Sequence, residues 1–200
     1  MARLLTLTIA LVLALGSGVR AGEPSWGVLD GREVNALKAA VQESNVDGGG
    51  SSNEVPRSES ARIWSNRGTY TVSLDKASGS GSRAYAVSSD WHTTAVAGVP
   101  TTGPSVTLEP VVLSALIAAN AQFDKTVQLD QASQIGRANG RFAENYVKRA
   151  TYVLVNISYT DALIDPQTDK TLPNGCGRFT RAYEVDLHTL SINEKTPSCD

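Results

Sequence analysis

This sequence of 200 residues lacks the features of a nucleic-acid-binding or membrane-spanning protein. Positive charge is not in excess, because 18 basic residues stand against 20 acidic ones and the formal net charge is −2. Such a balance gives no electrostatic footprint for nucleic acid or for an anionic membrane surface. No uncharged apolar run approaches the roughly 20 residues that cross a bilayer. We therefore expect neither nucleic acid as a partner nor insertion of the mature chain into a membrane.

Catalytic sequence motifs are also missing. The chain has no G-x-S-x-G nucleophile elbow, no H-E-x-x-H or C-x-x-C motif and no protein-kinase set. Its only histidines are His92 and His188, so any site that needs an imidazole must use one of them. The absence of these motifs favours a function other than catalysis and gives no reason to expect a cofactor.

The N-terminus resembles a secretory signal peptide in its three-part organisation. Arg3 supplies the positive region, Leu4 to Leu15 the apolar region, and Val19-Arg20-Ala21 a small-residue cleavage site. We expect residues 1–21 to be removed and the mature protein to be secreted or periplasmic. Loss of these residues takes the net charge from −2 to −4.

Only two cysteines are present, Cys176 and Cys199. An even number of cysteines in an exported chain indicates a disulfide. This bond would close the last part of the chain and stabilise it by about 3 kcal/mol of loop entropy. The alternative, a Cys176 nucleophile with His188 as its base, is not favoured, because reactive cysteines are usually flanked by helix N-termini or basic groups that lower the pKa of the thiol.

The mature chain begins with a helical segment and a polar loop. Residues 22–44 contain a capping-box spacing, Asp30 and Glu33, followed by apolar residues at helical spacing. Residues 45–60 are rich in glycine, serine and charge and lack apolar periodicity, so we expect a flexible loop there.

Residues 61–200 are expected to form the main α+β domain. Strand alternation predicts a hairpin over "GTYTVSL" and "RAYAVSSDWHTTAVA", a buried strand over residues 151–160 and a final strand over residues 178–192. Pro110 opens the longest helical pattern, which continues by spacing to about Arg149 as one kinked helix or two. We therefore expect one α+β domain. It has an antiparallel sheet of about four or more strands, packed with one long or two shorter helices, plus a short N-terminal helix.

Two Asp-x-His pairs fall on predicted strands. Alternation places Asp90 and His92 on one face, and Glu184, Asp186 and His188 on one face of the final strand. If the two strands were neighbours, the imidazoles and carboxylates could converge on a metal ion. We favour a solvated strand face, because alternate residues of one strand lie ~6.6–7 Å apart and cannot chelate an ion alone. No metal site is therefore expected.

Other candidate contact residues have ordinary structural explanations. Trp64 and Trp91 alternate with polar neighbours and should pack in the core, whereas Trp26 is a better contact candidate. The sequon at Asn156 falls inside a predicted strand, which disfavours glycosylation. The remaining candidates are basic residues of the predicted second helical segment, best explained as a charged surface: Arg137, Arg141, Lys148 and Arg149.

The favoured hypothesis is an exported soluble protein that acts on another protein through an interaction surface, as a binding, assembly or inhibitory module. The first alternative is a secreted hydrolase or metal-dependent enzyme that uses the region of His92 and His188. A secreted toxin or effector is the second alternative.

Overall fold

The computed structural model describes residues 26–76, 81–127, 142–159, 164–165, 170–171 and 179–199. Two helices lie in these ranges, α1 (Gly31–Asp47) and α2 (Pro110–Val127). The strands are β1 (Trp26–Asp30), β2 (Glu59–Asn66), β3 (Thr69–Lys76), β4 (Ser82–Val87), β5 (Thr93–Val96), β6 (Ser105–Leu108), β7 (Phe142–Lys148), β8 (Tyr152–Tyr159), β9 (Ile164–Asp165), β10 (Lys170–Thr171), β11 (Phe179–Asp186), β12 (Ile192–Glu194) and β13 (Ser198–Cys199).

The strands form two antiparallel sheets and a small two-stranded pair. The first sheet has six strands in the order β1-β7-β8-β11-β12, and β13 pairs with the other end of β11. The second sheet has five strands in the order β5-β4-β3-β2-β6, and β9 pairs with β10. The α+β class with an antiparallel sheet is thereby confirmed.

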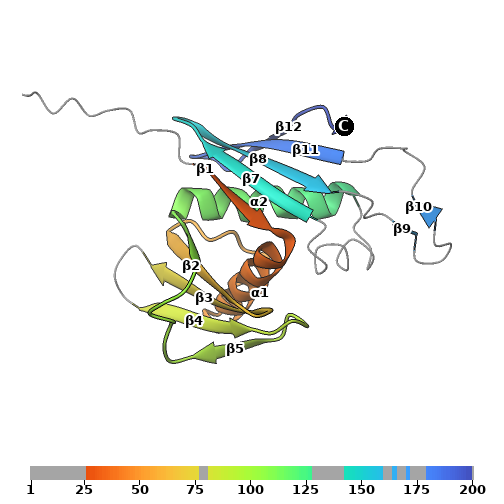
Figure 1. The fold of residues 1–200 in the computed structure, drawn as a ribbon. Coiled ribbons are helices and arrows are strands. Elements are labelled where there is room, and N and C mark those ends of the chain that lie inside the picture. Colours follow the sequence, from red (N-terminus) through yellow and green to blue (C-terminus); the bar gives the residue numbers. More distant parts are fainter. Residues whose placement is uncertain are drawn as a thin grey trace, which may run out of the picture.

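The two helices lie between the two sheets (Figure 1). Helix α1 packs mainly on β3 and β4 of the five-stranded sheet, and α2 packs on β8 and β11 of the six-stranded sheet and on β2 of the other. One hydrophobic core joins these layers, and its largest fully buried side chains include Phe123, Tyr85 and Tyr183. Each sheet therefore has an inner face on the helices and an outer face turned away from them.

Helix α1 confirms the capping box. The Asp30 carboxylate accepts hydrogen bonds from the backbone N–H groups of Arg32 and Glu33, and the Glu33 carboxylate accepts one from the N–H of Asp30. These bonds satisfy N–H groups that the first helical turn leaves unpaired. The preceding strand β1, which begins at Trp26, is absent from the sequence-based prediction.

The predicted flexible loop over residues 45–60 is a loop from Gly48 to Ser58 in the structure. Its tip is exposed, but Pro56 is buried and Val55 packs against the core. The Asn45 amide also donates to the carbonyl oxygen of Glu54 at 2.8 Å. Its flexibility stays a prediction.

The predicted helix continuing to Arg149 is wrong. Helix α2 begins at Pro110, as expected, but ends at Val127, and β7 (Phe142–Lys148) is a strand between β1 and β8. The spacing of Phe142 and Tyr146 fits one face of a helix as well as one face of a strand, so pairing with two neighbouring strands decided the conformation.

Two predicted strands are shorter than expected, because each is interrupted by a turn. Strand β4 ends at Val87, and residues 88–92 form the turn that leads to β5. Strand β11 ends at Asp186, and residues 187–191 form the turn to β12. Over the described ranges, neither helix has the length and apolar character needed to cross a membrane.

Candidate protein-binding surface

Strand β1 presents two large apolar side chains to solvent at an edge of the six-stranded sheet. Trp26 is 74% exposed and Val28 is 56% exposed, the largest values among the described large apolar residues. Tryptophan is usually well buried because its ring carries a large apolar surface. The exposure of Trp26 is therefore the most unusual feature of this surface.

Alternation along β1 places these side chains on the outer face of the sheet. Leu29, between Val28 and Asp30, is fully buried in the core, so its neighbours point the opposite way. The register continues the apolar row across two more strands, because Trp26 lies opposite Val147 of β7 and Val147 lies opposite Leu154 of β8. Val147 and Leu154 are half-buried. We call Trp26, Val28, Val147 and Leu154 the outer stripe.

Gly27 and Tyr146 fix the position of β1 on the sheet. The two residues are paired in the register, and the Tyr146 ring lies over the backbone of Gly27 on the inner face. A Cβ atom at position 27 would lie 2.6 Å from the hydroxyl oxygen of Tyr146 and 2.7 Å from its Cε1. Only glycine allows this close contact, which holds Trp26 and Val28 on the opposite face.

Replacing Gly27 by alanine should therefore displace the Tyr146 ring and loosen β1, with a loss of about 1–3 kcal/mol in the free energy of unfolding. Denaturant unfolding measures the loss. Gly98→Ala is the matched control, because nothing lies within 4 Å of a Cβ atom built at Gly98. Its effect should stay within about 0.5 kcal/mol. Equal stability of the two variants would contradict this role for Gly27.

The other edge strands differ from β1. Strands β5 and β6 have four residues each and β12 has three, whereas β1 has five. Short edge strands and nearby charges protect a sheet edge from pairing with another chain. Lys195 lies just beyond β12 and pairs with Glu184 of β11 at 2.7 Å. Strand β1 contains neither lysine nor proline.

The two other tryptophans contact side chains of the protein itself. Trp64 is buried, and the Arg62 guanidinium lies 5.0 Å above the centre of its ring. Trp91 is partly buried, packs against the core and stacks on Tyr70 with ring centroids 6.5 Å apart. The prediction that these two residues pack internally agrees with these positions, and the choice of Trp26 as the better contact candidate stays a prediction.

The structure places Asp90 and His92 on an exposed turn, so their predicted position on a strand is wrong. The backbone N–H of Trp91 donates to the carbonyl oxygen of Ser88, and the Ser88 hydroxyl donates to the Asp90 carboxylate. This hydroxyl, with backbone N–H groups, lowers the pKa of Asp90. A carboxylate held ionised in this way stabilises a turn and is poorly suited to be a general acid.

The second group is divided between a strand and a turn. Glu184 lies on the outer face of β11, Asp186 ends that strand, and His188 lies in the following turn and is exposed. The Asp186 carboxylate accepts hydrogen bonds from the backbone N–H groups of Thr189 and His188 at 2.8 and 3.0 Å. These hydrogen bonds hold the pKa of Asp186 below its usual range. The bonds from Thr189 contribute most, and the bond from His188 adds to them.

The two Asp-x-His pairs do not converge. The pair at 90 and 92 belongs to the five-stranded sheet and the pair at 186 and 188 to the six-stranded sheet, with the helices between them (Figure 1). In the ranges that the structure describes, no group of three or more His, Cys, Asp or Glu side chains is arranged to hold a metal ion. The arrangement that a shared metal site would need is therefore not present at these four residues.

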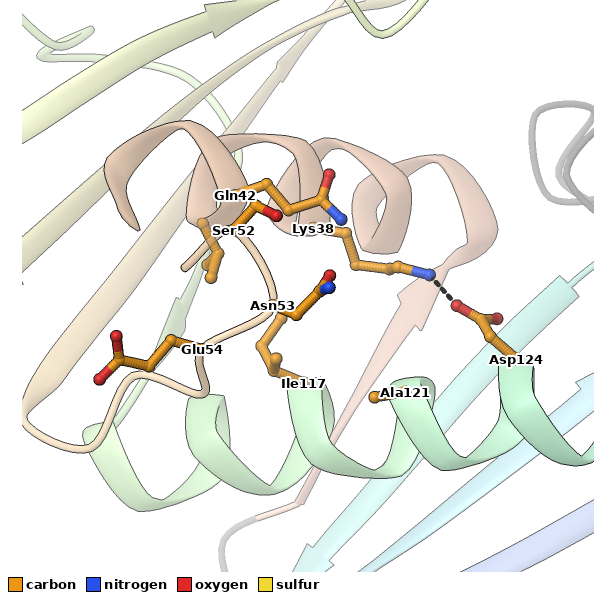
Figure 2. Close-up of a pocket in the computed structure, with 9 residues that line it drawn as sticks. Lys38, Gln42, Ser52, Asn53, Glu54, Ile117, Ala121 and Asp124 are labelled. Carbon is orange, nitrogen blue, oxygen red and sulfur yellow. Dashed lines mark hydrogen bonds and ion pairs between the residues drawn. The ribbon is translucent and has the colours of Figure 1, made fainter. Parts of the chain in front are cut away.

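A groove of about 310 Å³ lies between α1, α2 and the loop at residues 52–54. Figure 2 shows Lys38 of α1 reaching Asp124 of α2 at one end, where the two form an ion pair. Val41, Ile117 and Ala121 supply apolar lining. The volume is at the lower limit for small-molecule sites. Lys38 and Asp124 pair with each other, and Glu54 is the other charged residue of the lining.

The predicted disulfide falls partly outside the described residues, because Cys176 is not among them. The backbone places Cys199 in β13, opposite Phe179 of β11, and Cys176 precedes Phe179 by three residues. Three residues of chain span at most about 10 Å, so this pairing is compatible with the Cα separation of a disulfide.

Peptide mapping without reductant should therefore recover the segments around Cys176 and Cys199 as one linked species, and reduction should separate them. Two thiols that react freely with an alkylating reagent in the native protein would refute the pairing.

Three of the other sequence candidates, Lys148, Arg149 and Asn156, lie in the part of the chain that the structure describes. Arg137 and Arg141 lie outside the described residues, so the predicted basic surface is not described as a whole. Lys148 is on β7 and forms an ion pair with Glu109, and Arg149 follows it and is exposed. Asn156 is half-buried within β8, where its amide donates to the Asn145 side chain at 2.8 Å.

No family model, curated protein or solved structure matches this chain.

Proposed function

We propose that this chain is an exported protein-binding module whose contact surface is the outer stripe at the β1 edge. The observation that carries the proposal is the 74% exposure of Trp26 on an edge strand that also exposes Val28. Tryptophan is enriched among the few interface residues that supply most of the binding energy. Apolar side chains that are exposed as one contiguous patch, as in the outer stripe, favour a partner that covers them.

The position on an edge strand supports recognition by strand addition. Among the strands that the structure describes, β1 pairs with β7 alone. An extended segment of a partner can therefore pair with the backbone of β1 while its alternate apolar side chains contact Trp26 and Val28. In this mode main-chain hydrogen bonds supply affinity, and the outer stripe supplies specificity.

The enzymatic alternative has less support. It depends on a site shared by His92 and His188, and these residues lie on turns of different sheets. The carboxylates nearest to them, Asp90 and Asp186, have lowered pKa values and accept hydrogen bonds within their own turns. A binding module needs neither histidine, so His92→Ala and His188→Ala should leave partner binding unchanged.

Export is part of the proposal and rests on the sequence of residues 1–21. Intact-mass measurement of the protein recovered from the periplasm or the medium should show a chain that begins near Gly22. A species that retains Met1 to Ala21 would contradict export with cleavage.

Affinity capture from the native periplasm or medium tests the binding surface when the parent is compared with a Trp26→Ala, Val28→Thr double variant. Quantitative mass spectrometry should find a protein that the parent retains and the double variant loses by about 30-fold or more, as expected for an interface anchor worth about 2 kcal/mol. Val99→Thr, a change at a residue that is 41% exposed elsewhere, is the matched control and should retain the same protein. Capture that is independent of Trp26 and Val28 would overturn the proposal.

A further inference from the structure

A second pocket, of about 340 Å³, lies at the C-terminal end of α1, against the inner face of the five-stranded sheet. Antiparallel partners point to the same side of a sheet, and so do alternate residues of one strand. Arg83 of β4 is paired with Leu74 of β3, which is buried in the core, so Arg83 points inward. Lys76 lies two residues beyond Leu74 and is paired with Glu59 of β2, so both point inward as well. Charged side chains of three neighbouring strands therefore line this pocket.

The loop between α1 and β2 forms the other side of the pocket, to which it contributes Glu54 and Arg57. Two glycines bring its backbone close to the charged groups. A Cβ atom built at Gly50 would lie 2.9 Å from Oε2 of Glu54, and one built at Gly48 would lie 3.5 Å from Nη1 of Arg83. The missing side chain at position 50 therefore leaves room for the Glu54 carboxylate against the loop.

The charged side chains of this pocket are not paired with one another. They are Glu54, Arg57, Glu59, Lys76 and Arg83. Within the ranges that the structure describes, none of the five forms an ion pair. In the neighbouring groove, by contrast, Lys38 and Asp124 pair with each other, and Figure 2 shows Glu54 turned away from them.

One of these side chains already makes a hydrogen bond that fixes its position. Arg83 donates from Nη1 to the carbonyl oxygen of Ser44 in the last turn of α1, at 2.6 Å. A guanidinium has five N–H donors, so this bond leaves others for a ligand. The pocket thus offers a positioned cation on one strand, a further cation on the next strand, and carboxylates on the third strand and the loop.

We propose that this pocket binds a small zwitterion, a molecule of about the size of a dipeptide that carries both an ammonium group and a carboxylate. Arg83 and Lys76 donate charge-assisted hydrogen bonds to the carboxylate. Glu54 and Glu59 accept hydrogen bonds from the ammonium group, which the partial negative charge at the C-terminal end of α1 also favours. The proposal is independent of the proposed function, because the outer stripe lies on the other sheet.

The presence of both signs of charge selects a zwitterion over a simple ion. A ligand with a carboxylate alone would lie beside Glu54 and Glu59, and like charges held close together repel. A ligand with an ammonium group alone would lie beside three cations in the same way. The volume is near the lower limit for small-molecule sites, which suits a ligand of this size.

Isothermal titration calorimetry with alanyl-alanine as the probe tests the proposal. The dissociation constant should lie between about 10 μM and 1 mM, as expected for a small ligand held by a few charged contacts. N-acetyl-alanyl-alanine lacks the ammonium group, and alanyl-alanine amide lacks the carboxylate. Each should bind at least about tenfold more weakly, because each loses the hydrogen bonds to one set of charged groups.

Glu59→Gln and Lys76→Gln each remove one pocket charge and should each weaken binding of alanyl-alanine at least about fivefold. Lys125→Gln, a change at an exposed residue of α2 outside the pocket, is the matched control and should bind like the parent. Circular dichroism of each variant verifies that the fold is retained.

No binding of alanyl-alanine at concentrations up to about 10 mM would overturn the proposal. Equal binding of either blocked dipeptide, or binding that Glu59→Gln and Lys76→Gln leave unchanged, would overturn it as well. The Trp26→Ala, Val28→Thr double variant should bind alanyl-alanine as the parent does, so this result is separable from the test of the proposed function.

Discussion

Replacing Leu113 by alanine should lower the free energy of unfolding by about 2–5 kcal/mol. Leu113 is fully buried in the core on α2, the helix that packs against both sheets. The substitution removes apolar contacts and leaves a cavity, because close-packed layers on both sides of the helix relax only partly. Denaturant unfolding followed by circular dichroism measures the change.

Ile117→Ala, on the same helix, is the matched control. Ile117 is partly exposed and lines the groove between α1 and α2, so truncation there removes fewer buried contacts. We expect its cost to be well below that of Leu113→Ala. If the two variants lost equal stability, α2 would not form the middle layer of the core as the structure describes it.

Replacing Asn120 by alanine should cost about 1–3 kcal/mol, because it removes a hydrogen-bond donor from a buried carboxyl group. The Asn120 amide donates to Oε2 of Glu144 at 2.8 Å, and both residues are 1% exposed. The same amide donates to the carbonyl oxygen of Leu116. This contact joins α2 to β7, the strand that pairs with β1. It therefore also helps to hold the outer stripe in place.

Gln122→Ala controls for truncation of an amide side chain on the same helix. Its amide donates to the Thr126 hydroxyl at 3.1 Å at the surface, and its loss should change stability by less than about 0.5 kcal/mol. A double-mutant cycle with Glu144→Ala should also give a favourable coupling energy between Asn120 and Glu144. Additive effects would contradict a direct interaction.

Local sequence patterns predicted those elements whose conformation depends on neighbouring residues. The alternation of Tyr70, Val72 and Leu74 indicated β3, and all three side chains are buried. The spacing of Asp30 and Glu33 predicted the start of α1 because a capping box is formed within four residues. Neither prediction required knowledge of which strands pair.

Strand β7 was not predictable in this way. Its buried residues include Glu144, so the strand lacks the alternation of apolar and polar residues that identifies a half-buried strand. Strand β1 has only five residues, and two of its apolar side chains face solvent. Both strands are defined by pairing with distant segments, so the places of Val28 and Val147 in the outer stripe could not be inferred from the sequence.

For the candidates that contain histidine, strands were predicted to extend into segments that are turns in the structure. Alternation was extended through Asp90 and His92, although serine and aspartate at positions 88 and 90 are residues that favour turns. The same applies to Asp186, which accepts hydrogen bonds from two residues of the next turn, His188 and Thr189. The side chains that form these turns are polar, as those of a catalytic or metal site are. Their hydrogen bonds are made within the turns, and the two groups do not converge.

Photo-crosslinking from position 26 tests the central claim most directly. Trp26 would be replaced by a photoreactive benzoylphenylalanine, which keeps an aromatic side chain at the β1 edge, and the protein would be irradiated in the cells that produce it and in their medium. The same residue at position 99 is the control, because Val99 is also exposed but lies between β5 and β6 of the other sheet. The account predicts one specific adduct with another protein from position 26, reduced by Val28→Lys and absent from position 99. No adduct from position 26, or the same adducts from both positions, would contradict it.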